Sequence, residues 1–331
     1  MVLGSCSPSH VKLNFMHTTG YYTHSDCLLH DMGGGHPECP QRLLSIQDRL
    51  ISSGLEQVLQ WPDCALATVA DLSLAHDASY IEKIFRWDAE LNDEAADEYA
   101  FKQIDPDTRM NRHTLKAALR SVGAALAATD AVIDGQFENA FCAIRPPGHH
   151  ATRQRGMGFC LFNNVAIAIL HAIGRRGLKR VALIDFDVHH GNGSEDILSG
   201  LDEVLMVGFY QHPFYPGIHP DKEASNMVNL PIKAYTKGAA VRELVSEGWF
   251  PRLQAFEPEM IFVSAGFDAH QDDDMAQLML NTSDYAWITR EIMNLASRYA
   301  KGRIVSCLEG GYDLNSLAAS VEAHLRGLTD L

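Results

Sequence analysis

The 331-residue sequence lacks an excess of basic residues. It contains 27 Lys and Arg against 42 Asp and Glu, which gives a formal net charge of −15 and a pI near 5.4. Because binding to nucleic-acid phosphates needs a basic surface, no direct nucleic-acid partner is expected. The same acidic balance favours the approach of cationic substrates.

The sequence also lacks the marks of exported and membrane proteins. Its seven cysteines are scattered and form no C-x-x-C pair, which indicates reduced thiols. The N-terminal segment lacks the basic and apolar regions of a secretory signal, and no apolar run is long enough to span a bilayer. We therefore expect a cytoplasmic protein with no membrane partner.

No internal repeat, low-complexity segment or long linker divides the chain. Length alone permits one large domain or two ordinary ones, and we expect one domain over residues 1–331, with residues 1–11 as a loose N-terminal segment. The expected strands are Lys12–Met16, Ala140–Ile144, Arg180–Asp187, Val204–Tyr210, Met260–Ala265 and Arg303–Leu308. The expected helices are Pro40–Ser52, Ala78–Asn92, His113–Asp134, Asn163–Ile173, Lys237–Phe256, Ser283–Ala300 and Leu314–Leu328. This alternation predicts an α/β fold with a central, mostly parallel sheet and helices on both faces.

The segment from Leu183 to Gly193 carries the strongest chemical signal. Asp185 and Asp187 stand at the end of an apolar run, where buried parallel strands are normally apolar throughout. In an extended chain the two carboxylates point to the same side, and His189 joins them. Any one of these residues can be explained as a helix cap, but together they indicate a cation site.

Polar, glycine-bearing segments follow five of the predicted strands. They are residues 145–150, 185–192, 208–217, 264–270 and 309–313. Ligands of open α/β sheets bind at the carboxyl ends of the strands. One site at this edge of the sheet is therefore more probable than five unrelated loops.

Asp268 is the best candidate for a third metal ligand beside Asp187 and His189. It follows an apolar strand in a Gly-Phe-Asp turn, where an unpartnered buried carboxylate would be unfavourable. Two carboxylates and one imidazole leave positions open for water and substrate, as in catalytic zinc sites. The same ligand set is compatible with iron, manganese or cobalt.

His149 and His150 are adjacent in a loop rich in proline and glycine. Imidazoles titrate near neutrality, so the pair is suited to proton transfer. Alternatively, one histidine is structural and the other is exposed. Asp185 and Asn192, expected at the same sheet edge, are available to orient the two rings and favour the catalytic interpretation.

Further candidates lie in the remaining loops. Tyr312 follows two glycines and is placed to bind an oxyanion, although a packed surface tyrosine is the default for such a turn. The acidic run Asp272–Asp274 is expected to be a solvated loop face, with attraction of a cationic substrate as the alternative. The aromatic residues expected to line a channel for an alkyl chain, unless they belong to the core, are Phe159, Phe214 and Tyr215. The histidines of the N-terminal loop, expected at the rim or in structural roles, are His24, His30 and His36.

From Met16 to the C-terminus the sequence resembles the histone deacetylase superfamily, specifically its class II-like and bacterial members, including acetylpolyamine amidohydrolases. The matching motifs are Gly20-Tyr-Tyr, His36-Pro-Glu, Arg145-Pro-Pro-Gly-His-His-Ala151, Gly158-Phe-Cys-Leu-Phe-Asn-Asn164, Asp185-Phe-Asp-Val-His-His-Gly-Asn-Gly193, Phe214-Tyr-Pro-Gly217, Ser264-Ala-Gly-Phe-Asp-Ala269 and Glu309-Gly-Gly-Tyr312. Asn192, where class I members carry Asp, places the sequence with class II.

The resemblance implies an arginase/deacetylase-like fold and a zinc hydrolase that removes acetyl or related acyl groups from amines. It implies one catalytic zinc on Asp187, His189 and Asp268, and a structural potassium near Asp185, Asp187 and His189, held partly by main-chain carbonyls. The implied catalytic residues are His150 as base and acid, His149 as its electrostatic partner, Asp185 and Asn192 as their supports, and Tyr312 for the oxyanion. The implied substrate-binding residues are Gly158, Phe159 and Tyr215.

The sequence departs from the family pattern at positions that we expect on or near the rim of the site. They are Cys39, Tyr210 and the segment Gly217-Ile218-His219-Pro220. These departures affect the expected substrate more than the expected chemistry. A homo-oligomer is kept as an alternative to a monomer.

The leading hypothesis is deacetylation of acyl-lysine in proteins or peptides, and the second is deacylation of an acylated polyamine or another small amine. An arginase needs Asp-x-His-x-Asp, and Gly191 occupies the last of these positions. A non-catalytic acyl-lysine binder would be expected to have lost a metal ligand or the tyrosine, and this sequence has lost neither.

Overall fold

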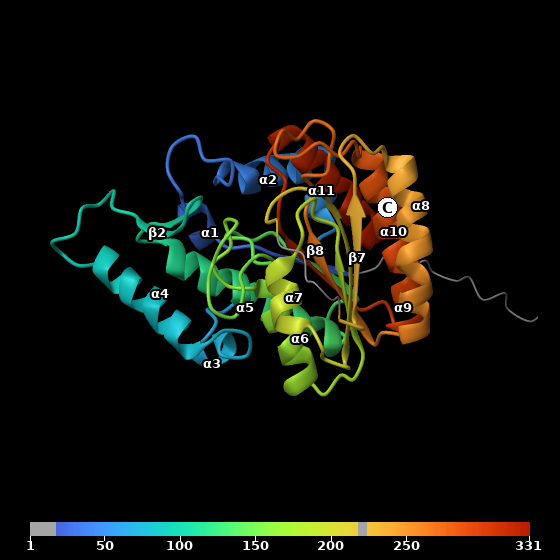
Figure 1. Ribbon diagram of the computed structural model, residues 1–331, viewed down its shortest axis with the longest axis horizontal. Helices are drawn as coiled ribbons and strands as arrows, with labels where there is room; N and C mark the ends of the chain where they lie inside the picture. The colour runs from blue at the N-terminus through green and yellow to red at the C-terminus, as the bar shows by residue number, and fades with distance from the viewer. Residues whose placement is uncertain (1–17, 218–223) are drawn as a thin grey trace, which may run out of the picture.

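A single seven-stranded parallel sheet organises the protein, as a computed structural model describing residues 18–217 and 224–331 shows (Figure 1). The strand order is β1 (Thr19–Tyr22), β4 (Asn139–Cys142), β9 (Ile304–Leu308), β8 (Met260–Ala265), β5 (Val181–Asp185), β6 (Val204–Gln211) and β7 (Met227–Ile232). Every pairing in this sheet is parallel. The predicted α/β fold with a central parallel sheet is therefore confirmed.

Apolar residues alternate between the two faces of the central strands. On β5, Ala182 and Ile184 belong to one hydrophobic cluster, whereas Val181 and Leu183 belong to the other. This period of two buries both faces of the strand. The sheet therefore needs a helical layer on each side.

The first layer of helices packs against the face that carries Ile184. It comprises α2 (Gln41–Ser53), α8 (Gly238–Gly248), α9 (Phe250–Phe256), α10 (Thr282–Tyr299) and α11 (Leu314–Thr329). The second layer packs against the opposite face, and it comprises α3 (Val69–Leu72), α4 (Ala78–Leu91), α5 (Thr114–Ile133), α6 (Asn164–Gly174) and α7 (Asn192–Leu198). Outside these layers lie α1 (Asp26–Leu29), η1 (Leu55–Gln57) and a hairpin of β2 (Lys102–Asp105) and β3 (Thr108–Met110).

Most predicted elements are observed within two residues of their expected ends, and the exceptions have local causes. The single helix predicted over Lys237–Phe256 is instead two helices, because Gly248 ends α8 and Pro251 sits in the first turn of α9. The strand predicted over Lys12–Met16 lies outside the described residues. β7 was not predicted, and it contains Pro231, which is tolerated because β7 is an edge strand.

Within the described residues, no helix is both long and apolar enough to cross a membrane. The assignment of the whole chain to one domain stays a prediction.

Candidate active site

Five loops meet at the carboxyl edge of the sheet, as predicted, and they carry a dense group of buried polar residues. The strand β5 ends at Asp185, two residues earlier than predicted, because its carboxylate accepts the N–H of Asp187 at 3.1 Å. Asp187 and His189 therefore lie on a turn beyond the strand. The side chain of Asp185 contacts His149, whereas Asp187 and His189 belong to the cluster of metal-ligating side chains.

Asp187, His189 and Asp268 form the only cluster of metal-ligating side chains found among the described residues. Nδ1 of His189 lies 3.0 Å from Oδ1 of Asp187 and 3.1 Å from Oδ2 of Asp268. The three ligand atoms lie within 4.8 Å of one another, and all three residues are buried. The structure thus brings together the three predicted ligands.

The surrounding backbone leaves room for these ligands and aims them. A Cβ atom at Gly310 would collide with the carboxylates of both Asp187 and Asp268. The N–H of Gly310 donates to Asp187 at 2.8 Å, and the N–H of Val188 donates to Asp268 at 2.9 Å. Each carboxylate is thereby fixed by the main chain while another oxygen faces His189.

Electrostatics at this cluster favours a cation. Burial, followed by the nearby Asp187 carboxylate, raises the pKa of Asp268 to about 6. Two carboxylates and one imidazole nitrogen, buried and convergent, are a donor set that suits a divalent metal with open positions. The residues present therefore fit the zinc ion that the family resemblance implies.

The two predicted histidines lie side by side next to this cluster, with ring centroids 4.0 Å apart. Nδ1 of His149 lies 3.1 Å from Asp185, and Nδ1 of His150 lies 2.7 Å from Oδ1 of Asn192. Because an amide oxygen only accepts, His150 donates from Nδ1. When His150 is neutral, its Nε2 therefore carries a free lone pair.

The surroundings give the two rings opposite protonation states. Burial disfavours a charge on His149, but the carboxylates of Asp187 and Asp185 outweigh it and raise the pKa of His149 to about 10. Burial lowers the pKa of His150 well below its usual value, and the neighbouring His149 adds to this shift. The pair thus combines a charged imidazole with a neutral one.

The backbone of the histidine pair is held by a residue that the sequence analysis noted only as part of a glycine turn. A carboxylate oxygen of Glu309 accepts the N–H of Gly148 at 2.7 Å and the N–H of His149 at 3.1 Å. Its other oxygen accepts the hydroxyl of Ser264 at 3.2 Å. Glu309 thus ties the loop after β4 to the loop after β9.

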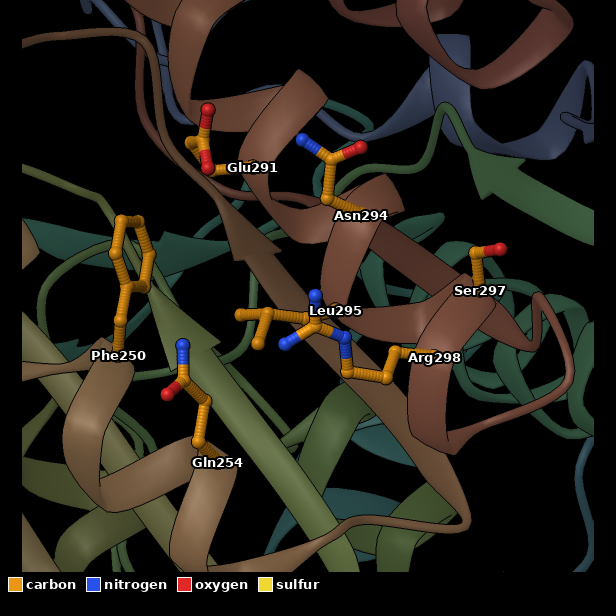
Figure 2. Close-up of a pocket in the computed structure, with 7 residues that line it drawn as sticks. All are labelled: Phe250, Gln254, Glu291, Asn294, Leu295, Ser297 and Arg298. Carbon is orange, nitrogen blue, oxygen red and sulfur yellow. The ribbon is translucent and has the colours of Figure 1, made fainter.

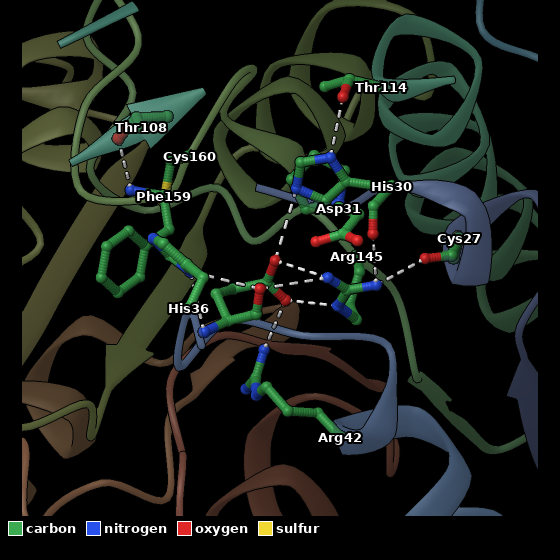
Figure 3. A network of polar contacts seen from close by, with 12 residues as sticks. Cys27, His30, Asp31, His36, Arg42, Thr108, Thr114, Arg145, Phe159 and Cys160 are labelled. Carbon is green, nitrogen blue, oxygen red and sulfur yellow. Dashed lines mark hydrogen bonds and ion pairs between the residues drawn. The ribbon is translucent and has the colours of Figure 1, made fainter. Parts of the chain in front are cut away.

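A buried ionic network lies beneath the same loops (Figure 3). Glu38 accepts hydrogen bonds from Arg42 at 3.1 Å and from Nη2 of Arg145 at 2.7 Å. Arg145 also donates to the carbonyls of Cys27 at 2.8 Å and His30 at 3.0 Å. Burial opposes ionisation of Glu38, but Arg145 and the other basic neighbours hold its pKa well below the usual range. Sequence reasoning recognised Glu38 and Arg145 only as parts of motifs.

The predicted substrate-binding residues border the histidines and Tyr312. The ring of Phe159 packs edge-on against Tyr312 at 5.8 Å, and the ring of Tyr215 packs edge-on against His150 at 5.2 Å. Gly158 has a positive φ of 55°, and a Cβ atom there would collide with the ring of His150. Only glycine fits this position without displacing the histidine.

Two expectations about individual residues are wrong. Tyr210 does not lie at the rim: it is buried within β6, with its ring 4.8 Å from His190. The acidic run is not a solvated face throughout, because Asp273 is buried and accepts main-chain N–H groups. Cys39 is partly exposed just before α2, and the segment 218–220 lies outside the described residues.

Two cavities differ in their position: one is lined by none of the site residues, and the other lies beside Phe159. A cavity of about 530 Å³ lies between α9 and α10 and is lined only by residues of these two helices, among them Phe250, Glu291 and Arg298 (Figure 2). A cavity of about 410 Å³ opens beside Phe159 and is also lined by residues 32–37 and by Asp107. The second cavity adjoins the predicted site.

Comparisons with known proteins agree with the geometry. The sequence matches the family described as "Histone deacetylase domain" over residues 36–328. It is 36% identical to "Type-2 histone deacetylase 2" of Dictyostelium discoideum, over 93% of this chain and 20% of that protein. It is also 36% identical to "Polyamine deacetylase HDAC10" of Mus musculus, over 86% of this chain and 43% of that protein. The chain thus spans about a fifth of the length of the Dictyostelium protein and less than half of the length of the mouse protein.

A solved structure extends the agreement to the fold. The crystal structure of the HDA15 HD domain superposes on this protein with a TM-score of 0.87 at 28% sequence identity. The superposition covers 95% of this chain and 88% of the HDA15 chain. Sequence motifs, sheet topology and the arrangement of loops at the sheet edge lead to one assignment. This chain belongs to the histone deacetylase family.

Proposed function

We propose that this protein is a zinc-dependent amidohydrolase that removes acetyl or related acyl groups from the side-chain amine of lysine in proteins or peptides. The observation that carries the proposal is the convergence of Asp187, His189 and Asp268 on one point beside the His149–His150 pair. Bound there, zinc would polarise the acyl carbonyl and make a water molecule more acidic.

His150 is the proton-transferring group in this proposal. Its neutral ring has a free lone pair on Nε2, because Nδ1 donates to Asn192. It takes the proton from the attacking water and later returns a proton to the leaving amine. The positive charge on neighbouring His149, held by Asp185, stabilises negative charge that develops on the substrate.

Tyr312 supplies a hydrogen bond to the oxyanion. Burial raises the pKa of its phenol well above the usual value, so the hydroxyl keeps its proton at neutral pH and can donate. Phe159 and Tyr215 would flank the apolar stem of the acylated chain, and the carbonyl of Gly158 would accept the substrate N–H. These roles are implied by the family resemblance and fit the observed positions.

An acylated polyamine or another small acylated amine is the second candidate substrate. Similarity to a mouse polyamine deacetylase and the net charge of −15 favour it, because polyamines are cationic. A non-catalytic binder is the weakest candidate, because the three metal ligands and Tyr312 are all present. A structural potassium, a cytoplasmic location and a lack of nucleic-acid partners remain part of the proposal.

Metal analysis and a substrate panel test the proposal together. We expect about one zinc per chain and hydrolysis of a fluorogenic acetyl-lysine peptide, with loss of activity on chelation and recovery on adding zinc. Full activity in metal-free protein would refute the mechanism. Comparing acetyl-lysine peptides with acetylputrescine and acetylspermidine at matched concentrations decides between the two substrate classes.

A further inference from the structure

The acidic run Asp272–Asp274 contains one residue that differs from its neighbours. The side chain of Asp273 is only 3% exposed, whereas Asp272 and Asp274 are exposed. A buried carboxylate is unfavourable unless it is fully hydrogen-bonded. Its partners therefore indicate why it is there.

The carboxylate of Asp273 accepts hydrogen bonds from the main chain at Tyr312. One carboxylate oxygen accepts the N–H of Tyr312 at 2.6 Å and the N–H of Asp313 at 3.1 Å. The other oxygen accepts the N–H of Met275 at 3.0 Å, which closes a turn in its own loop. Hydrogen bonds to an ionised acceptor are stronger than those between neutral groups, so this contact is a firm anchor.

Arg42 donates hydrogen bonds to the carbonyl groups of the same loop. Its Nε donates to the carbonyl of Gly311 at 2.6 Å, and another nitrogen donates to the carbonyl of Glu309. The guanidinium carbon also lies 5.0 Å from the centroid of the Tyr312 ring. An anion therefore binds the N–H groups of this loop, while a cation binds its carbonyls.

The loop needs such anchors because of its composition. Tyr312 follows Gly310 and Gly311, and Gly311 has a φ of 120°, a conformation that L side chains rarely adopt. Glycine has more backbone freedom to lose than any other residue, so an unanchored Gly-Gly turn would sample many conformations. A group that must meet a developing charge loses much of its effect when it is displaced by about 1 Å.

We infer that Asp273 is a positioning residue for Tyr312: by binding the N–H groups of Tyr312 and Asp313 it holds the phenol in the place where the proposed reaction needs it. The inference rests on the proposed function, in which Tyr312 binds the oxyanion. It adds that the deacetylase reaction depends on a carboxylate that need not touch the substrate.

A purely structural role is the alternative. Asp313 caps the N-terminus of α11, and Asp273 binds its N–H, so loss of Asp273 would also weaken this helix start. A structural defect would lower stability and affect catalysis regardless of which side chain occupies position 312. A positioning role would affect turnover only while the phenol is present.

The kinetic test is a double-mutant cycle. We expect Asp273→Ala to lower kcat roughly 10- to 100-fold on an acetyl-lysine peptide, with KM changed by less than about twofold. In protein that already carries Tyr312→Phe, the same substitution should change kcat by less than about twofold. Asp274→Ala, which removes an equal charge from the neighbouring exposed position, is the matched control and should leave kcat unchanged.

A second measurement does not depend on activity. In metal-free protein, hydrogen–deuterium exchange at residues 309–313 should be faster in Asp273→Ala than in the wild type or in Asp274→Ala. Asp273→Asn provides a milder variant, because its amide oxygen can still accept the N–H groups of Tyr312 and Asp313. Its kcat should lie between those of the wild type and Asp273→Ala.

The outcomes separate the inference from the function on which it rests. Near-wild-type turnover in Tyr312→Phe would refute the proposed role of Tyr312. A large loss in Tyr312→Phe combined with unchanged turnover in Asp273→Ala would refute only the positioning role. An equal loss from Asp273→Ala with and without the phenol, or unchanged exchange at residues 309–313, would also overturn it.

Discussion

His149 at the carboxyl edge of the sheet and His324 in the hydrophobic core are both almost inaccessible, with exposures of 2% and 0%. Their environments nevertheless differ in charge. His149 faces the carboxylates of Asp185 and Asp187, and its pKa rises to about 10. Burial lowers the pKa of His324 to about 3.

Hydrogen bonding sets the tautomer of the neutral His324 ring. The hydroxyl of Thr289 donates a hydrogen bond to the carbonyl of Tyr285, so its oxygen accepts one from Nδ1–H of His324 at 2.7 Å. Nε2 then accepts from the hydroxyl of Ser306 at 2.9 Å. The comparison shows that burial alone does not mark a functional histidine in this protein. The sign of the charge around the ring distinguishes the site from the core.

The largest expected effect is at the metal cluster. Asp268→Ala removes a ligand, so zinc content should fall sharply and kcat should fall by about a thousandfold or more, as loss of several kcal/mol of metal stabilisation implies. The metal-free variant should be close in stability to the metal-free wild type at pH 7.5. The pKa of Asp268 is raised to about 6, so its ionised form opposes folding, and this cost offsets the hydrogen bonds that it accepts from Val188 and His189.

Metal analysis and thermal unfolding of the metal-free proteins check this prediction. Tightly bound zinc in Asp268→Ala would reject the ligand assignment. A large drop in the unfolding temperature would show instead that Asp268 stabilises the fold. The sheet-edge site would then contribute to stability as the core around His324 does.

A smaller effect is expected from the support of His149. Asp185→Asn removes one of the charges that raise the pKa of His149, so this histidine should lose its proton at a lower pH. We expect a 10- to 100-fold lower kcat, on the scale of other changes to groups that orient a catalytic imidazole or metal ligand, with near-normal zinc content. The check is the pH profile of kcat: its alkaline limb should move to lower pH, and an unmoved limb would contradict the assignment.

The core histidine should behave in the opposite way. His324→Leu leaves the hydroxyl of Ser306 without its acceptor, so the free energy of unfolding should fall by about 1–3 kcal/mol while kcat stays unchanged. Urea denaturation and a standard activity assay measure the two quantities. His113→Leu, at an exposed position, is the control and should change neither. A loss of turnover in His324→Leu would show that His324 contributes to catalysis.

The smallest effect concerns pH and the same variant. The pKa of His324 is about 3 in the folded protein and near 6.5 when exposed, so its contribution to stability is complete above pH 6.5 and is lost as the pH falls. The wild type should lose up to about 1.4 kcal/mol per pH unit below 6.5 relative to His324→Leu. Chemical denaturation at pH 7.5, 6.5 and 5.5 tests this, and a constant difference would refute the neutral assignment.

Where local pattern and strand position sufficed, the sequence predicted which residues come together at the sheet edge. Asp187 and Asp268 follow apolar strands, so the topology of a parallel sheet brings them together at one edge. Contacts between distant loops were not predictable. Nothing in the run Asp272–Asp274 distinguishes the middle carboxylate, because its burial depends on the position of Tyr312 some 39 residues away. The ionic network around Glu38 was missed for the same reason.

The hairpin of β2 and β3 lies outside the main sheet, yet it touches the site. The hydroxyl of Thr108, at the start of β3, accepts the N–H of Phe159 at 2.9 Å. The hairpin lies between α4 and α5 in the chain and is not part of the sheet whose strands β5 and β8 precede the metal-binding residues. Substitutions in this hairpin can therefore shift Phe159 while Asp187, His189 and Asp268 stay in place. Under the proposed function, this hairpin is a place where the shape of the substrate-binding surface can change while the metal-binding residues stay as they are.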